Sequence, residues 1–291
     1  MSVADITRIR IEPTGAALGA DVYGINPADP SAEDMAAVKA ALRDHLVVRL
    51  RGYEISDVQF SRFAEQFGEL EGSPAYSRSR PVYLAETPHI TIISNVVEDG
   101  APIGEHGDGE LNWHSDKGFV ELPSACTFLL GREVPPSGGN THFCNMYNAA
   151  DRIPAALRKE LSDLKLKHQR SHTAQGTRRP GYVDIGTDDP RELPGPQHPI
   201  LRTHPESGRQ ALYLGRRFGG YIVGLPLARS EALLSELWGY AGLPEDSWAQ
   251  EWQTGDLAIW DNRCTMHRRD AFPGMGRRRM HRLTTISERP Y

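Results

Sequence analysis

The chain has 291 residues, of which 39% are hydrophobic and 24% charged, a composition typical of a folded globular protein rather than a disordered or fibrous one. Its formal net charge of -5 argues against nucleic acid as the main partner. No apolar run reaches the roughly 18 residues that a membrane helix needs, and the first twelve residues lack the apolar core of a secretory signal.

Three cysteines lie far apart, and they are odd in number without a Cys-x-x-Cys pair. This usage suits a reducing compartment and argues against a disulfide framework or a thiolate zinc site. We therefore expect a cytoplasmic protein that does not contact a membrane.

The N-terminal part predicts two strands and two helices. Residues 7–13 alternate apolar and polar side chains, as a half-buried strand does. A helix begins after Ser31, which can cap it, and its apolar side chains recur at helical spacing as far as Leu46. A branched apolar run over 46–50 predicts a buried strand, and a second amphipathic helix follows over 56–67.

The rest of the chain predicts many short strands and few helices. Residues 96–112 and 173–199 are rich in glycine or proline and in charged residues, so we expect a long mobile loop and a second surface excursion. A late helix is expected over 230–240. Strands are expected over 125–130, 141–145, 200–203, 212–214, 257–260 and 282–286. This pattern predicts a mainly β sandwich or barrel with flanking helices, forming one domain over residues 1–291.

Two histidines and one aspartate are candidates for a metal site. In the segment Trp-His-Ser-Asp over 113–116, an extended backbone points His114 and Asp116 to the same side. His267 follows a glycine turn and an apolar run, and we expect it just past the end of a strand. Two histidines and a carboxylate form the facial triad that suits non-haem iron(II). Taken singly, each of these residues is more often a surface or hydrogen-bonded group than a ligand.

An arginine cluster, Arg-Arg-Arg-Met-His-Arg, covers residues 277–282. On a strand, Arg278, Met280 and Arg282 share one side, and the other three residues share the opposite side. Such clusters usually form a solvated face or a phosphate-binding patch. A guanidinium pointing inward instead needs an anionic partner, and a carboxylate accepts two parallel hydrogen bonds from it.

Four motifs occur in a fixed order: the His-x-Asp pair, Pro-Pro-Ser-Gly-Gly-Asn-Thr over 135–141, Gly-Asp-Leu-Ala-Ile-Trp-Asp-Asn-Arg over 255–263 ahead of His267, and the arginine cluster. Together they resemble the taurine dioxygenase and 2,4-dichlorophenoxyacetate dioxygenase family of iron(II)- and 2-oxoglutarate-dependent enzymes. The resemblance runs from about residue 68 to residue 282. It implies the cupin-like jelly roll, also called the double-stranded β-helix.

The resemblance assigns roles to individual residues. It implies that His114, Asp116 and His267 bind iron(II), and that Thr141 and Arg278 bind the carboxylates of 2-oxoglutarate. The implied reaction consumes oxygen, yields succinate and carbon dioxide, and hydroxylates an unactivated C–H bond. Halogenating relatives carry a small residue in place of the carboxylate ligand, so the retained Asp116 favours hydroxylation.

The substrate is less clearly indicated. The segment around Tyr76 resembles taurine dioxygenases, but Ser73 stands where they carry a sulfonate-binding histidine, and Glu110 stands where they carry an asparagine. Arg282 matches the position that meets an anionic group of the prime substrate. We therefore expect a small carboxylate, with aryloxyalkanoates favoured.

Two alternatives to this function remain open. The first is an oxygenase for alkylsulfonates, sulfate esters or phosphonates, and the second is a jelly-roll protein that holds a non-redox metal such as zinc. The resemblance also implies a homo-oligomer, a dimer or a tetramer.

Overall fold

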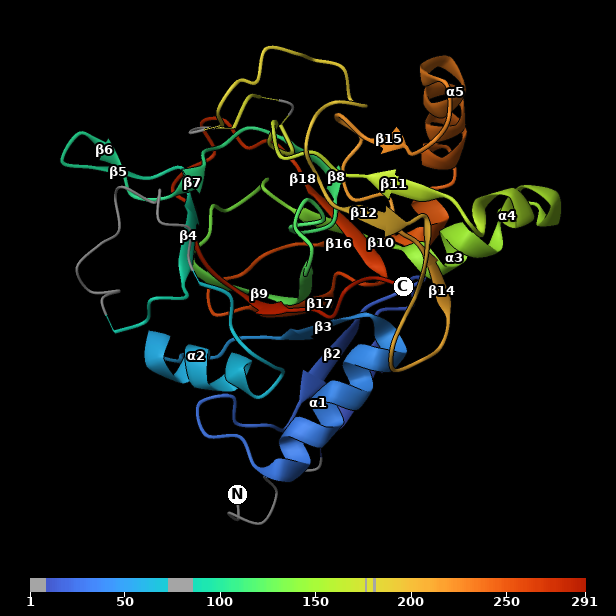
Figure 1. Ribbon diagram of the computed structural model, residues 1–291. Coiled ribbons are helices and arrows are strands. Elements are labelled where there is room, and N and C mark those ends of the chain that lie inside the picture. Colours follow the sequence, from blue (N-terminus) through green and yellow to red (C-terminus); the bar gives the residue numbers. More distant parts are fainter. Residues whose placement is uncertain (1–8, 73–85, 176, 180–181) are drawn as a thin grey trace, which may run out of the picture.

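Two facing β-sheets with helices on their outer sides form the protein (Figure 1). The structure is a computed structural model that describes residues 9–72, 86–175, 177–179 and 182–291. Within these residues the larger sheet has eight strands in the order β1-β2-β3-β17-β9-β19-β4-β7, and the smaller sheet has four in the order β16-β10-β18-β8. The arrangement is the jelly roll that the sequence predicted.

The strands of the larger sheet are β1 (Arg10–Pro13), β2 (Ala20–Tyr23), β3 (Val47–Leu50), β4 (Thr91–Ser94), β7 (Glu105–His106), β9 (Ser124–Glu133), β17 (Leu257–Asp261) and β19 (Arg279–Ile286). Those of the smaller sheet are β8 (Leu111–His114), β10 (Thr141–Asn145), β16 (Ser247–Gln250) and β18 (Thr265–Arg269). Shorter pairings involve β5 (Val97–Glu98), β6 (Ala101–Pro102), β11 (Lys165–Lys167), β12 (Gln197–Pro199), β13 (Leu201–Thr203), β14 (Gln210–Leu212) and β15 (Tyr221–Ile222). The helices are α1 (Ala32–His45), α2 (Asp57–Glu65), α3 (Met146–Asp151), α4 (Ala155–Leu161), α5 (Leu227–Trp238) and the 3-10 helix η3 (Pro244–Asp246).

The alternating side chains of the central strands build two hydrophobic cores. On β17, Leu257 and Ile259 belong to the core that α1 and α2 cover, whereas Ala258 and Trp260 belong to the core between the two sheets. Figure 1 shows α1 and α2 beneath the larger sheet and α3 to α5 at the other side of the molecule. The space between the sheets is therefore where inward-facing polar side chains from both sheets meet.

The N-terminal helices begin where the sequence predicted. Ser31 and Ser56 each accept a hydrogen bond from the backbone three residues ahead, at Asp34 and Gln59, and the side chains of those residues bond back to the cap. These capping boxes fix the start of α1 and α2. Both helices then pack on the larger sheet.

Three details differ from the sequence-based expectations. The predicted strand over 7–13 is β1, which begins at Arg10 and is exposed rather than half-buried because it lies at the sheet edge. The late helix begins at Leu227 behind Pro226, and the Ser230 hydroxyl accepts a bond from the backbone of Ile222 instead of capping it. The expected loop over 96–112 contains the short strands β5, β6 and β7.

In the part of the chain that the structure describes, no helix is both long and apolar enough to cross a membrane.

Candidate active site

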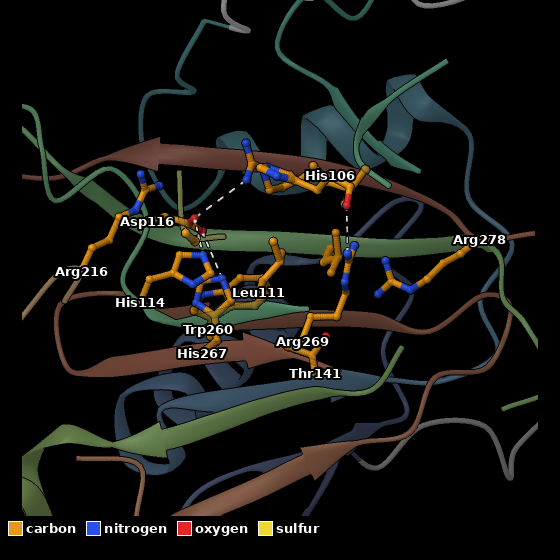
Figure 2. Close-up of a pocket in the computed structure, with 14 residues that line it drawn as sticks. His106, Leu111, His114, Asp116, Thr141, Arg216, Trp260, His267, Arg269 and Arg278 are labelled. Carbon is orange, nitrogen blue, oxygen red and sulfur yellow. Dashed lines mark hydrogen bonds and ion pairs between the residues drawn. The ribbon is translucent and has the colours of Figure 1, made fainter. Parts of the chain in front are cut away.

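His114, Asp116 and His267 meet between the sheets (Figure 2). His114 ends β8 and lies directly opposite His267 in the β8–β18 pairing, and Asp116 follows two residues after His114. Nε2 of His114 lies 3.9 Å from Oδ1 of Asp116, and Nε2 of His267 lies 3.9 Å from Oδ2. Atoms at this separation can bind one ion at bond lengths of about 2.0–2.2 Å. His267 lies inside β18, so the expected place past a strand end was wrong.

The protonation states of the triad suit metal binding. The Nδ1 atom of His114 lies 2.7 Å from the carbonyl oxygen of Asn112, to which it must donate, so its Nε2 is free to act as a ligand. Burial raises the pKa of Asp116, but the electrostatic effects of His267 and Arg282 outweigh it and hold the pKa well below its usual range. Asp116 is therefore ionised at neutral pH. Burial lowers the pKa of His267, so this imidazole is neutral at neutral pH.

A hydrogen-bond network fixes the orientation of Asp116. The Thr127 hydroxyl donates to Oδ2 of Asp116 at 2.7 Å and accepts from the Asn262 amide at 2.8 Å. The Asn262 carbonyl oxygen in turn accepts from the indole of Trp260 and from the backbone of Asp116, both at 3.1 Å. The Trp-Asp-Asn motif of β17 thus supports a carboxylate that lies far away in the sequence.

The triad lines a pocket with about 560 Å³ of space not filled by atoms, a volume that includes space open to solvent. Both sheets contribute to its wall, the smaller one through β8, β10 and β18 and the larger one through β4, β9, β17 and β19. Its lining residues are Ile93, His106, Leu111, His114, Asp116, Leu129, Thr141, Ala174, Arg216, Trp260, His267, Arg269, Arg278 and Arg282. Among them Asp116 is the single acid, against four arginines.

Arg278 forms the end of the pocket away from the triad (Figure 2). Its side chain is 1% exposed, and none of its three guanidinium nitrogens has a hydrogen-bond partner among the described residues. Burial, together with the nearby charge of Arg269, lowers the pKa of Arg278 to about 9, so the group remains positive at neutral pH. A buried charge of this kind needs an anion, and a carboxylate fits it.

Thr141 and the glycines ahead of it shape the same end of the pocket. The Thr141 hydroxyl accepts a 3.0 Å hydrogen bond from the indole of Trp252, which leaves its own proton free to donate. Gly139 has a φ of +63°, and a Cβ atom there would lie 3.2 Å from Nε of Arg278. Gly139 therefore makes room for the Arg278 side chain, and this end of the pocket could hold the distal carboxylate of 2-oxoglutarate.

Arg282 lies near the metal end, with Nη1 3.8 Å from Oδ1 of Asp116. Arg278 and Arg282 both line the pocket, as the strand alternation predicted, while His281 turns away and bonds Asp57 at 2.7 Å. Of the other predicted substrate positions, Glu110 is exposed, lies 3.9 Å from Arg268 and is not among the pocket-lining residues. Ser73 and Tyr76 lie outside the described residues.

Three charged or titratable residues of the pocket were not identified from the sequence: His106, Arg216 and Arg269. Burial and the charges of Arg282, Arg269 and Arg216 lower the pKa of His106 to about 3, so this histidine is neutral. A signal existed for Arg269, which follows His267 by two residues, the spacing of side chains on one side of a strand. His106 lies in a polar loop segment whose sequence has no periodic pattern.

A second cluster, His204, Asp261 and Cys264, also brings together potential metal ligands. However, both ring nitrogens of His204 are already used, because Nδ1 accepts from the backbone of residues 206 and 207 and Nε2 lies 3.0 Å from Asp261. Asp261 is further bound by Arg263, and burial raises the pKa of the Cys264 thiol. This cluster is a structural network at the end of β17.

The chain is similar to known dioxygenases. The profile of a family described as "Taurine catabolism dioxygenase TauD, TfdA family" matches residues 10–284. The alpha-ketoglutarate-dependent 2,4-dichlorophenoxyacetate dioxygenase of Burkholderia sp. (strain RASC) is 32% identical over 84% of this chain and 82% of its own length. Pentalenolactone F synthase of Streptomyces arenae is 33% identical over 95% and 94%.

A solved structure is also similar over nearly the whole chain. It is the crystal structure of AAD-2 in complex with Mn(II) and N-oxalylglycine, with a TM-score of 0.78 and 26% identity, covering 98% of this chain and 99% of that one.

Proposed function

Because the chain belongs to the TauD, TfdA family and is a dioxygenase dependent on 2-oxoglutarate (alpha-ketoglutarate), we propose that it hydroxylates an unactivated C–H bond of a small anionic substrate at an iron(II) site. In this proposal His114, Asp116 and His267 bind the iron, and Thr141 and Arg278 bind 2-oxoglutarate. Arg282 binds an anionic group of the prime substrate.

One observation carries the proposal. A single pocket has two imidazoles and a carboxylate at one end and, at the other, a buried guanidinium that lacks a partner among the described residues. Two histidines and one carboxylate leave coordination positions open for a chelating keto acid and for oxygen. The second carboxylate of 2-oxoglutarate would pair with the guanidinium, so one molecule of this co-substrate could contact both ends of the pocket.

The residues of the chain would bind, orient and shield the reactants. Bound iron(II), 2-oxoglutarate and molecular oxygen would supply the oxidising chemistry: one oxygen atom enters succinate as 2-oxoglutarate loses carbon dioxide, and the other hydroxylates the prime substrate. Arg278 and Thr141 fix the position of the co-substrate, and the Asn262–Thr127 network holds the Asp116 carboxylate. The apolar walls, including Leu111 and Leu129, exclude water from the reaction.

The charge of the pocket supports an anionic substrate. Arg282 and Arg216 both line it near the triad, and Asp116 is the single acid among the described lining residues. A carboxylate can pair with either guanidinium while its carbon skeleton lies against the apolar wall. We favour an aryloxyalkanoate, since the similar Burkholderia enzyme acts on 2,4-dichlorophenoxyacetate.

The test is a substrate screen that measures succinate release and oxygen uptake with iron(II) and 2-oxoglutarate. We expect turnover with aryloxyalkanoates, weak or absent turnover with taurine, and loss of all activity in the Asp116→Ala variant. Strong turnover with taurine or a sulfate ester and none with carboxylates would favour the sulfonate or sulfate-ester alternative. Absence of coupled uptake with every substrate class and metal would instead favour a non-redox metal protein.

A further inference from the structure

Arg269 occupies the middle of the pocket. On β18 it follows His267 by two residues, so both side chains point to the same side of the strand, and it lies directly opposite Thr141 in the β10–β18 pairing. Figure 2 shows its guanidinium between the metal triad and Arg278. Any keto acid that spans these two ends passes Arg269.

Arg269 is buried, and only part of its hydrogen-bonding capacity is used. Its side chain is 3% exposed, and Nη2 donates to the carbonyl oxygens of His106 and Gly109. Its Nε and Nη1 atoms have no hydrogen-bond partner among the described residues. Asp108 lies near enough to act on it electrostatically, but no ion pair joins the two within the described part of the chain. Two donors therefore remain available to a bound ligand.

A second guanidinium, that of Arg278, lies near that of Arg269 (Figure 2). The guanidinium carbons of Arg269 and Arg278 lie 5.0 Å and 5.6 Å from the ring centre of Phe272. Two buried positive charges repel each other unless an anion accompanies them. Asp108 forms no ion pair with Arg269 among the described residues, and the acid that lines the pocket, Asp116, lies at its other end. An anionic ligand would therefore neutralise the two guanidinium groups.

We propose that Arg269 is a further co-substrate-binding residue, whose guanidinium joins Arg278 and Thr141 in holding the distal carboxylate of 2-oxoglutarate. The inference rests on the function proposed above. Because Nη2 of Arg269 also bonds the backbone of residues 106 and 109, the same side chain connects the bound co-substrate to the loop that carries His106.

A purely structural role for Arg269 makes a different prediction. If it only tethers the loop, its loss lowers the stability of the ligand-free protein but affects all ligands of the metal equally. If it binds the distal carboxylate, its loss weakens 2-oxoglutarate selectively. Oxalate separates these cases, since it chelates the metal but has no distal carboxylate.

The experiment measures binding of 2-oxoglutarate and of oxalate to the Mn(II)-loaded protein by isothermal titration calorimetry, without turnover. We expect Arg269→Met to raise the Kd of 2-oxoglutarate about tenfold or more, as loss of a charged hydrogen bond does, and to change that of oxalate less than about twofold. Arg269→Gln keeps a donor for the loop carbonyls but removes the charge, and should behave as Arg269→Met does. Arg269→Gln also tests the proposal if Arg269→Met does not fold.

Two controls separate failure of the inference from failure of the function. Arg268→Met changes the adjacent arginine, which lies outside the pocket and bonds Asp270, and should bind both ligands as the unmodified protein does. Arg278→Ala should lose 2-oxoglutarate binding. If the unmodified protein does not bind 2-oxoglutarate, the proposed function fails. If Arg278→Ala loses binding while both Arg269 variants retain it, or if they weaken oxalate equally, the inference is overturned and the function stands.

Discussion

At the scale of single residues, Arg278 differs from its neighbours because its guanidinium has no hydrogen-bond partner among the described residues. Its neighbours in the cluster, Arg277 and Arg279, both pair with Glu133 at the surface, and His281 pairs with Asp57. Arg278 points inward and finds no acid among the described residues. The cluster therefore divides into residues that pair with acids outside the pocket and two arginines, Arg278 and Arg282, that line the pocket.

We predict that Arg278→Ala weakens the apparent affinity for 2-oxoglutarate by at least ~2 kcal/mol, because a bidentate charged interaction is lost. This corresponds to a rise of about 30-fold in KM for 2-oxoglutarate, measured by succinate release at saturating prime substrate. Thr141→Val should have a smaller effect of the same kind. An unchanged KM in the Arg278 variant would mean that another arginine binds 2-oxoglutarate.

We predict that Asn262→Ala weakens metal binding, although Asn262 is not itself a proposed ligand. Its side chain bonds Thr127 and the backbone of Asp116, and without it the carboxylate loses its fixed orientation. Loss of such a supporting partner typically costs about 10- to 100-fold in metal affinity. Titration of the metal-free protein with Mn(II), followed by electron paramagnetic resonance, measures the change. Equal affinities in the two proteins would mean that Thr127 alone orients Asp116.

At the scale of elements, β7 depends on an unusually close approach to the neighbouring strand. It pairs with β4 in parallel, and Gly104 precedes it. A Cβ atom at Gly104 would lie 2.7 Å from the carbonyl oxygen of Ile92, so any side chain there pushes the two strands apart. The backbone of β7 ends at His106, which lines the pocket. The glycine thus permits the contact that brings a loop residue into the site.

We therefore predict that Gly104→Ala impairs substrate binding more than metal binding. The displaced segment moves His106, and its contact with Arg269, while the triad on β8 and β18 stays in place. A rise of several-fold in the KM of the prime substrate with near-normal Mn(II) affinity is the expected result. Gly72→Ala is the matched control, because a Cβ atom at Gly72 meets no atom of the described residues within 4 Å. Equal effects of the two substitutions would contradict the argument.

The sequence predicted elements well where local pattern decides them. The strand over 141–145 is found unchanged as β10, and the alternation on β19 correctly placed Arg278 and Arg282 on one side. The sequence-based prediction failed where the extent of a strand depends on pairing partners that lie far away in the chain. His267 was expected past a strand end, so the inward direction of Arg269 was not assigned. The strand over 265–269 can be assigned only from its pairing with β8 and β10.

At the scale of the whole molecule, the site results from two sheets that the sequence does not place relative to each other. The family resemblance, which rests on the order of four motifs, implied the triad, Thr141 and Arg278 as site residues. Periodicity could not show that the loop residue His106 and Arg216 face the same cavity, because these residues enter it through segments without a repeating pattern. Glu110 illustrates the limit, since the neighbouring Leu111 lines the pocket while Glu110 itself is exposed.

Two buried histidines outside the pocket affect the stability of the whole fold. Burial, with the electrostatic effects of nearby His198 and Arg216, lowers the pKa of His168 to about 3. Burial also lowers the pKa of His198 to about 4. Both values lie below the pKa of about 6.5 expected in the unfolded chain, so the folded state holds these residues neutral. Their contribution to stability is present above about pH 6.5 and is lost as the pH falls toward their folded pKa values.

We predict that the free energy of unfolding falls between pH 7.5 and pH 5.5, and that each of these histidines contributes about 1 kcal/mol to the decrease. The unfolded chain takes up protons over this range, and the folded chain does not take them up at His168 or His198. His168→Gln should therefore lower stability at pH 7.5 through lost packing but reduce the difference between the two pH values by about 1 kcal/mol. Urea unfolding at pH 7.5 and pH 5.5 measures the free energy of unfolding of both proteins. If the decrease between the two pH values is as large in the variant as in the unmodified protein, His168 becomes protonated in the folded state.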